Sequence, residues 1–331
     1  MNKFESIKPD KFRKKIKEKV DEAIDIFWKK NPKLEFIDCP FCNKNDFKSY
    51  FEIKSFNYLK CNHCNSIYIS PRPNEESLKM FYDIDPNKLV ISDLLSKVRE
   101  NRKNILLKKR WKQIKENFLS QNIKLPVDTL LEIGPGIGQF LEILNEDKVA
   151  KRYVAIEPSK DCYKILDKIE FIEAYNSTLE RFNKKLSADL IFLNSVIEHP
   201  YSLDKFFSNL KYNLKPTGTI SLYDMNSEGM DVVFLRGDTQ NYNPMYILQV
   251  GSKKGIELLL EKHNLRLVET FSGGELDVEI IYDYVRKLNV NEPLSRFNEF
   301  FEVSEFRNNF QNFLKENFKS GYNFYFIKNK L

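Results

Sequence analysis

The sequence predicts an α/β fold, in which a mostly parallel sheet has helices on both faces and is preceded by an N-terminal helix and a small cysteine-rich module. Three observations predict this fold. From residue 128 onward short apolar runs alternate with amphipathic segments, a glycine-rich turn follows the first of these runs, and four of the five cysteines form two close pairs. Alternating strands and helices are typical of βαβ units, whose parallel strands are buried on both faces.

Composition sets limits on the class of protein. The chain has 331 residues, of which 42% are hydrophobic and 14% aromatic, so it can bury the core of one large domain with a smaller appendage. Its net charge of +6 is a mild excess, which we interpret as a lysine-rich solvated surface rather than a nucleic-acid interface. We find no apolar run long enough to span a bilayer and no secretory signal, so we expect a cytoplasmic protein.

The N-terminal part is predicted to be helical on both sides of the cysteine module. Apolar side chains recur at helical spacing in residues 11–29, 75–83 and 88–120. One face of the last helix gathers four large side chains, Leu107, Trp111, Ile114 and Phe118. The sequence Pro71-Arg72-Pro73 predicts a hinge after the module. We therefore divide the chain into 1–73 (N-terminal helix and cysteine module), 74–127 (helical connector) and 128–331 (main domain).

The main domain is predicted to contain five apolar strands in its first half. They cover residues 129–133, 153–156, 171–172, 190–193 and 219–223. Amphipathic helices are expected between them, for example at 139–145 and 203–214. Close to the end of the chain a phenylalanine-rich helix around Phe310 precedes a last apolar run at 322–327, which we expect to pair near the edge of the same sheet.

The strongest chemical signal is the turn Glu132-Ile-Gly134-Pro135-Gly136-Ile-Gly138, between the first strand and the first helix. Glycine is needed where a ligand lies against bare backbone, and the start of the helix adds unpaired N–H groups. The third glycine comes one residue too early for the G-x-G-x-x-G fingerprint of dinucleotide-binding proteins. A Lys-Ser/Thr pair, which a phosphate-binding P-loop requires, is also absent from the turn.

This turn resembles motif I of the class I S-adenosylmethionine-dependent methyltransferases. The resemblance covers residues 128–331 and implies a Rossmann-like, seven-stranded, mostly parallel sheet and S-adenosyl-L-methionine as the cofactor. In that family the loop faces the methionine part of the cofactor, and the acidic residue before the glycines helps to hold its amino group. The resemblance therefore implies cofactor contacts for Glu132, Gly134, Pro135, Gly136 and Gly138.

Two further segments are expected beside the same cofactor. The second strand ends in Glu157, followed by Pro158, and a carboxylate there can accept hydrogen bonds from both ribose hydroxyls. The resembled family uses an acidic residue at this position; the alternative is a carboxylate that stabilises a helix start. After the third strand, Thr178 and Leu179 correspond to a loop that borders the adenine in similar proteins, although a helix N-cap is the alternative for this segment.

The end of the fourth strand resembles motif IV of small-molecule methyltransferases. Asn194 and Ser195 end the strand at the edge where cofactor and acceptor should meet, and Glu198-His199 follow. We predict His199 as the general base and Glu198 as a group that orients it or contacts the acceptor. The alternative is that both residues only shape the loop. Some similar enzymes have a metal-binding Glu where this chain has Ser195, so a catalytic magnesium is not implied.

The cysteine pattern predicts a metal site. Cys39-x-x-Cys42 and Cys61-x-x-Cys64 are two knuckles separated by residues 43–60, a spacing that fits a zinc ribbon. Four thiolates leave no open coordination position, so the zinc should be structural, with iron as the alternative metal. The fifth cysteine, Cys162, lies on the apolar face of a predicted helix and is expected in the core.

The whole chain resembles bacterial methyltransferases associated with surface polysaccharides and modified sugars, on the cysteine ribbon, Pro71-Arg72-Pro73 and the methyltransferase core. This resemblance implies a small polar acceptor, such as a sugar or a nucleotide-linked sugar. The pocket for it is expected in the insert 227–250, whose polar and aromatic residues are Asp231, Arg236, Asp238, Asn241 and Tyr242. A ribosomal RNA methyltransferase with a zinc ribbon and a non-catalytic S-adenosylmethionine-binding protein are the alternatives. The residues leave the acceptor atom and the oligomeric state open.

Overall fold

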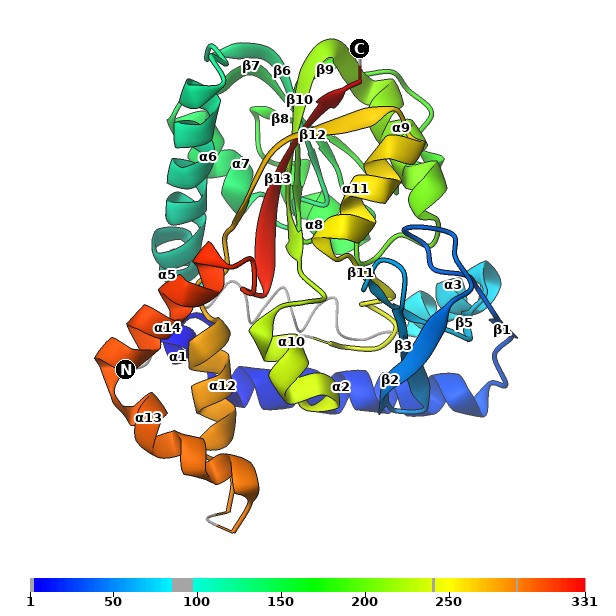
Figure 1. Cartoon of the computed structure of the whole chain (residues 1–331). Helices are drawn as coiled ribbons and strands as arrows, with labels where there is room; N and C mark the ends of the chain where they lie inside the picture. The colour runs from blue at the N-terminus through cyan, green and yellow to red at the C-terminus, as the bar shows by residue number, and fades with distance from the viewer. Residues whose placement is uncertain (1–2, 85–97, 240–241, 290, 331) are drawn as a thin grey trace.

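The computed structural model describes residues 3–84, 98–239, 242–289 and 291–330 (Figure 1). Its centre is a seven-stranded sheet of order β12-β13-β10-β9-β6-β7-β8, in which only the pairs made by β13 are antiparallel. The strands are β6 (Val127–Ile133), β7 (Ala150–Ile156), β8 (Ile172–Tyr175), β9 (Ala188–Asn194), β10 (Leu214–Met225), β12 (Leu265–Ser272) and β13 (Tyr322–Asn329). The predicted α/β fold with a mostly parallel sheet is confirmed.

Helices cover both faces of this sheet (Figure 1). They are α6 (Lys108–Ser120), α7 (Gln139–Glu146), α8 (Lys160–Leu166), α9 (Leu203–Asn213) and α11 (Lys253–Lys262). Successive strand residues point to opposite faces, so Leu131 packs with the core under α9 and α11, while Leu130 packs with the core under α6 and α7. Burial on both faces explains why the central strands are continuous apolar runs.

Of the two strands on the β12 side of the sheet, β13 was predicted and β12 was not. The run at 322–327 is part of β13, which lies between β10 and β12. The edge strand β12 was missed because charged residues such as Arg266 and Glu269 interrupt its apolar pattern, and only two of its eight residues are buried. Cys162 on α8 is only half-buried, so its assignment to the core was wrong.

The N-terminal part forms a second, smaller sheet of order β11-β4-β3-β2. Its strands are β2 (Phe47–Ile53), β3 (Phe56–Cys61), β4 (Ile67–Ile69) and β11 (Gln249–Val250). Since β11 comes from the segment predicted as main domain, the second sheet crosses the proposed boundaries at 73 and 127, and the division of the chain stays a prediction. The predicted hinge at 71–73 is instead a short strand, β5 (Arg72–Pro73), paired with β1 (Leu34–Glu35).

Several helices lie beyond the carboxyl ends of the main strands (Figure 1). They include α1 (Lys3–Ile7), α2 (Asp10–Lys29), α3 (Glu75–Ile84), α5 (Arg99–Arg102), α10 (Met230–Leu235), α12 (Asp277–Val285), α13 (Asn298–Glu302) and α14 (Ser304–Glu316). Short turns are η2 (Leu179–Arg181), η3 (Arg236–Asp238) and η4 (Pro293–Phe297). In the described part of the chain, none of the helices has the length and apolar character that crossing a bilayer requires.

The predicted helix at 88–120 is described from residue 98, and its first part lies outside the described residues. From Arg99 onward the chain runs through α5, a π-helical turn η1 (Lys103–Leu107) and α6. Its predicted apolar face is confirmed: Leu107, Trp111, Ile114 and Phe118 are all buried against the sheet.

Candidate functional site

The glycine turn leads from β6 into α7. Gly134, Gly136 and Gly138 have φ angles of 65°, 59° and 80°, in the left-handed region that favours glycine. A Cβ at Gly134 would lie 3.2 Å from Val196, and one at Gly138 would lie 2.8 Å from Leu166. A Cβ at Gly136 would meet nothing within 4 Å. The backbone at Gly136 therefore borders open space, where a ligand can lie against it.

Glu157, at the end of β7, is held directly against this turn. The backbone N–H of Gly136 donates to Glu157 Oε2 (3.0 Å), and the N–H of Ser159 donates to Oε1 (2.8 Å). The Asn176 amide donates to the carbonyl oxygens of Glu157 and Pro158 (2.9 and 3.1 Å). The carboxyl ends of β6, β7 and β8 thus meet in one corner, where the sequence predicted the nucleoside.

The two residues predicted near the adenine have different environments. Leu179 is buried in the main core, which gives this side chain a packing role whether or not a ligand is present. Thr178 precedes the turn η2, but its side chain makes no capping hydrogen bond. The alternative interpretation of this segment as a helix N-cap therefore has no hydrogen bond to support it.

On the other side of the glycine turn, a chain of polar contacts joins three residues. Arg110 Nη1 donates to Asn194 Oδ1 (3.1 Å), and Asn194 Nδ2 donates to Glu132 Oε1 (3.0 Å). Glu132 is 2% exposed, and its second oxygen, Oε2, is buried without a hydrogen-bond partner among the described residues. Burial raises the pKa of Glu132 to about 7, although the Asn194 hydrogen bond and the charge of Arg110 oppose the shift.

Arg110 was missed by the sequence analysis. It lies on α6 with its guanidinium 3.7 Å from the centre of the Tyr223 ring, and it has no carboxylate partner among the described residues. In the sequence it ends the basic triplet 108–110, and its position beside Trp111, a residue of the predicted apolar face, was the available signal. A guanidinium without a carboxylate partner and a carboxylate oxygen without a donor, both judged among the described residues, suit the two charged ends of an amino acid.

The loop after β9 carries the predicted catalytic pair. His199 is exposed, and its Nδ1 lies 2.7 Å from the carbonyl oxygen of Tyr246. A carbonyl only accepts, so Nδ1 donates and Nε2 keeps the lone pair that a general base needs. Ser195, with a φ of 56°, makes the bend that ends the strand, and its N–H donates to the carbonyl of Tyr223 (2.8 Å).

Glu198 is buried and hydrogen-bonded to a second carboxyl group, Asp224 at the end of β10. Asp224 also accepts hydrogen bonds from the backbone N–H groups of Ile197 (3.0 Å) and Met225 (2.8 Å). Burial raises the pKa of both carboxyl groups, and their proximity adds to the shift at Asp224. Two buried carboxyl groups in contact disfavour a state in which both are charged. Asp224 was missed although it ends a predicted strand, as Glu157 does.

The insert expected to line the acceptor pocket is partly described. Asp231 and Tyr242 are buried, whereas Asn241 lies outside the described residues. Arg236 lies over the Tyr50 ring (5.6 Å), and Asp238 accepts a hydrogen bond from the Tyr284 hydroxyl (2.9 Å). Beside the insert, Tyr322 stacks on Tyr223 with ring centres 5.0 Å apart and an interplanar angle of 9°. These contacts gather aromatic rings and buried carboxyl groups beyond the ends of β9 and β10.

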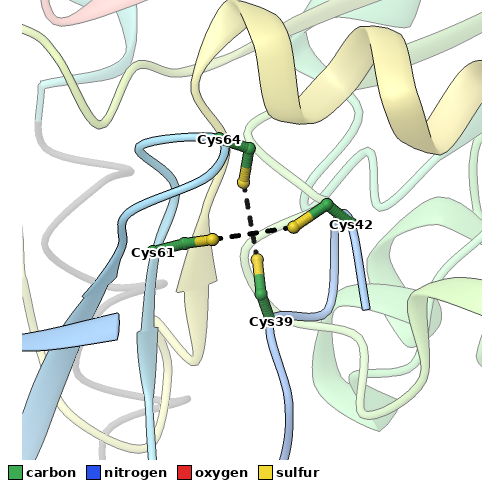
Figure 2. A group of neighbouring side chains, drawn as sticks. All are labelled: Cys39, Cys42, Cys61 and Cys64. Atoms are coloured by element: carbon green, nitrogen blue, oxygen red, sulfur yellow. Dashed lines mark hydrogen bonds between the residues drawn. The ribbon is translucent and has the colours of Figure 1, made fainter. Parts of the chain in front are cut away.

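The four predicted metal ligands come together between the knuckles of the second sheet (Figure 2). Their sulfur atoms all lie within 4.8 Å of one another; Cys39 and Cys64 are 3.5 Å apart, and Cys42 and Cys61 are 3.6 Å apart. A tetrahedron of sulfurs at the usual zinc distance has edges of roughly 3.8 Å. The set fits a four-coordinate thiolate site without an open position.

Comparison with known proteins adds family information. The model of a methyltransferase domain matches residues 92–270, more than half of the chain. No curated protein sequence matches the chain significantly.

Similar solved structures include one described as a sarcosine dimethylglycine methyltransferase from Galdieria sulphuraria, with 16% identity over 70% of this chain and 88% of that one and a TM-score of 0.47. An O-methyltransferase from Brevibacillus brevis with S-adenosyl-L-homocysteine has 16% identity, coverages of 61% and 67%, and a TM-score of 0.41. Geranyl diphosphate C-methyltransferase from Streptomyces coelicolor has 12% identity, coverages of 67% and 81%, and a TM-score of 0.44.

Proposed function

The chain belongs to the family of the methyltransferase domain and is an S-adenosylmethionine-dependent methyltransferase, and from this premise we propose that it methylates a small polar acceptor, a sugar or a nucleotide-linked sugar. The observation that carries the proposal is the glycine turn, where Gly136 borders open space and where the carboxylates of Glu132 and Glu157 end the strands β6 and β7. The acceptor class rests on the surrounding rings and polar groups and on the resemblance of the whole chain to sugar-modifying enzymes.

We assign the cofactor contacts residue by residue. The backbone of Gly134, Pro135, Gly136 and Gly138 lies along the methionine part and Glu157 with Pro158 along the ribose. Thr178 and Leu179 border the adenine. The unpartnered oxygen of Glu132 accepts from the cofactor's amino group, and Arg110 pairs with its carboxylate. Asn194 and Ser195, at the end of β9, shape the site where the cofactor and the acceptor meet. The buried, unpartnered Glu132 oxygen supports this fit, because it needs a donor that the described residues do not supply.

The catalytic roles follow from the loop after β9. S-adenosyl-L-methionine, when bound, supplies an electrophilic methyl group. His199 Nε2 accepts the proton of an acceptor hydroxyl, because the carbonyl of Tyr246 holds the ring in the suitable tautomer. Glu198, held by its contact with Asp224, is the second polar group beside the acceptor. Asp224 is a positioning residue, since it acts through Glu198.

We assign structural zinc to Cys39, Cys42, Cys61 and Cys64. Two sulfur pairs at 3.5 and 3.6 Å cannot all carry negative charge without a cation between them, and no disulfide joins these thiols. A closed four-thiolate site contributes folding free energy rather than chemistry. The location of the protein in the cytoplasm stays a prediction.

Calorimetry tests the cofactor assignment. S-adenosyl-L-homocysteine should bind the full-length, zinc-loaded protein, and Glu157→Gln should weaken this binding. Glu173→Gln is a matched control, because Glu173 lies on the adjacent strand β8 and pairs with Arg152 at the surface. A screen of nucleotide-linked sugars with radiolabelled S-adenosyl-L-methionine then tests the acceptor. Absence of S-adenosyl-L-homocysteine binding would overturn the assignment; methylation of RNA but of no sugar would replace the acceptor class.

A further inference from the structure

Exposed aromatic side chains line the C-terminal helical arm, which comprises η4, α13 and α14. Five of its apolar side chains are between 38% and 57% exposed: Phe297, Phe300, Val303, Phe306 and Phe313. Phe306 lies 5.9 Å from Phe300 and 5.8 Å from Phe310 between ring centres, and Phe310 lies 6.4 Å from Phe313. Phe301 links Phe297 to Phe306, at 6.5 and 5.8 Å. These five side chains, which we call the aromatic stripe, therefore form one continuous apolar surface.

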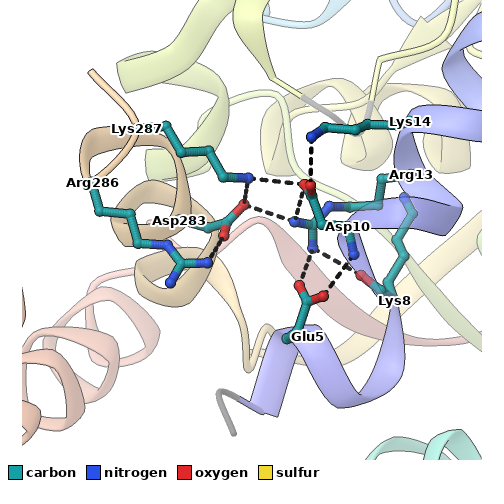
Figure 3. A network of polar contacts seen from close by, with 8 residues as sticks. All are labelled: Glu5, Lys8, Asp10, Arg13, Lys14, Asp283, Arg286 and Lys287. Carbon is teal, nitrogen blue, oxygen red and sulfur yellow. Dashed lines mark hydrogen bonds and ion pairs between the residues drawn. The ribbon is translucent and has the colours of Figure 1, made fainter. Parts of the chain in front are cut away.

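The arm that carries the stripe is held against the rest of the chain. Its inner side chains Phe301 and Leu314 are buried in one cluster with Ile281 of α12. Helix α12 is in turn fixed to α2 by a buried ion pair, in which Arg13 Nη2 donates to Asp283 Oδ2 at 2.9 Å (Figure 3). The stripe is therefore a preformed surface, which reduces the ordering cost of binding a partner.

The aromatic stripe is large for a surface exposed to water. An enclosed phenylalanine buries about 150–250 Å², so side chains exposed to these fractions leave roughly 400 Å² of apolar area. Contiguous apolar patches of a few hundred Å² mark interaction sites. Helix α14 has 13 residues, a length of about 20 Å that gives room for about four turns of a partner helix.

Acidic side chains surround the stripe. Glu299, Glu302 and Glu305 are interspersed with its apolar residues along the chain, and all three are exposed. None of the three pairs with a cation in the described part of the chain. The surface of the arm thus has negative charge beside its apolar side chains, although the whole chain has a net charge of +6.

The cations of the arm do not balance these carboxylates. Arg307 pairs with Glu279 at 2.9 Å, and Lys315 pairs with Glu275 at 2.6 Å. Both cations are already neutralised and point largely away from water, with side chains 17% and 21% exposed. Arg296 is the one exposed cation of the arm, all of whose residues the structure describes. The surplus around the stripe is therefore negative.

This acidic rim distinguishes between the possible occupants of the stripe. It repels the phosphates of nucleic acids and anionic lipids. A second copy bound by two-fold symmetry would place the same rim against itself, which opposes like charges. A helix with an apolar face flanked by lysines or arginines complements both the rings and the carboxylates.

We propose that the aromatic stripe is a docking surface for a basic amphipathic helix of a partner protein. The apolar face of that helix packs on the phenylalanines, and its cations pair with Glu299, Glu302 and Glu305. This inference does not depend on the proposed methyl transfer, because the arm contributes none of the cofactor or acceptor contacts assigned above.

Fluorescence anisotropy with labelled synthetic peptides tests the docking surface. The probe is a leucine–lysine peptide of about 18 residues, with leucines at helical spacing along one face. One control peptide replaces every lysine by glutamate, and another has the same composition in scrambled order. The full-length, zinc-loaded protein should bind the probe about ten-fold or more tightly than either control peptide.

Variants then locate the binding site. Phe300→Ser and Glu302→Lys should each weaken binding of the probe about ten-fold or more, since one removes an exposed ring and the other reverses a rim charge. Leu119→Ser, at an exposed leucine of α6, and Glu18→Lys, at an exposed glutamate of α2, are matched controls that should bind as the wild type does. Melting curves verify that all four variants are folded.

Four results would overturn the docking surface. The probe and the control peptides would bind equally, or both stripe variants would keep the wild-type affinity. Sedimentation that shows a dimer lost in Phe300→Ser would make a second copy the occupant. Binding to phosphatidylserine vesicles that is lost in the same variant would make a membrane the occupant.

Discussion

The side-chain amide of Gln249 donates a hydrogen bond to the carbonyl oxygen of Ile197 (3.0 Å). The same amide donates to the carbonyl of Pro200 (2.9 Å), so it bridges the two ends of the loop that contains Glu198 and His199. The backbone of Gln249 pairs with Tyr68 in the second sheet. One residue thus connects the cysteine module to the proposed catalytic loop.

Removal of the metal should therefore affect catalysis through this connection. We expect chelation, or Cys42→Ser, to lower the melting temperature by several degrees, at about 2–4 °C per kcal/mol for a domain of this size, and to reduce kcat. The affinity for S-adenosyl-L-homocysteine should change less, because the glycine turn is anchored by β6 and β7. Melting curves, calorimetry and initial rates check this. Cys162→Ser is the control, and an unchanged kcat in metal-free protein would contradict the connection.

Two glycines of the turn should respond differently to alanine. Gly136→Ala places a Cβ in open space at a positive φ, so it should cost about 1–2 kcal/mol of stability and weaken S-adenosyl-L-homocysteine binding. Gly138→Ala has the same backbone strain and adds a 2.8 Å contact with Leu166, so its melting temperature should fall further. Melting curves and calorimetry of both variants separate the effects. Equal binding by Gly136→Ala and wild type would exclude a ligand beside this backbone.

The main sheet could be predicted because its signals are local. Apolar runs, the glycine turn and the strand-end carboxylate Glu157 each follow from residues that are adjacent in the sequence. The edge strand β12 could not be recognised from its pattern, because edge strands are half-exposed and carry charges. The pairing of β11 with β4 was equally inaccessible, since two residues such as Gln249 and Val250 contain no periodicity and pair only through tertiary packing.

The residues of the candidate site could likewise be predicted only where their signal was local in the sequence. Glu132, Glu157 and the cysteines were found from motif spacing. The partners Arg110 and Asp224 were not, because their roles depend on contacts across 84 residues (Arg110 to Asn194) and between two strands. Such contacts depend on how helix α6 and strand β10 pack, which the sequence pattern does not specify.

His199→Ala should lower kcat by about 10²- to 10⁴-fold if the imidazole removes the acceptor proton. The affinity for S-adenosyl-L-homocysteine should stay unchanged, because His199 lies on the loop beyond β9 rather than in the glycine turn. His263→Ala is the control, since His263 caps α11 and pairs with Asp204. Rates with the acceptor found in the sugar screen provide the measurement. An unchanged kcat would show that a group other than His199 is the general base.

Arg110 should increase the binding affinity only for cofactors and analogues that carry a carboxylate. Arg110→Met is expected to weaken S-adenosyl-L-homocysteine binding by about ten-fold or more, the usual effect of losing a charge-assisted contact. Methylthioadenosine, which lacks the amino-acid group, should bind wild type and variant alike. Lys108→Met, a neighbouring exposed lysine, is the control. Equal losses for both ligands would show that Arg110 supports the fold of the site and does not bind the carboxylate.

Glu132 should couple cofactor binding to proton release. Its folded-state pKa of about 7 lies above the unfolded value of 4.5. Between these two pH values the carboxyl group is therefore mainly protonated in the folded, ligand-free protein and mainly ionised in the unfolded chain. The resulting stability, about 3 kcal/mol, is fully present below pH 4.5 and is lost as the pH rises through 7. Glu132→Gln should remove this pH dependence of the melting temperature.

The cofactor's ammonium group, placed against Glu132, favours the ionised carboxylate and should lower its pKa. Binding of S-adenosyl-L-homocysteine between pH 5 and 7 should therefore release up to one proton. Calorimetry in buffers of different ionisation enthalpy measures this number directly. Glu132→Gln should release none, and methylthioadenosine should release none from the wild type because it has no ammonium group. Proton uptake on binding, or equal release with both ligands, would contradict the assigned contact between Glu132 and the amino group.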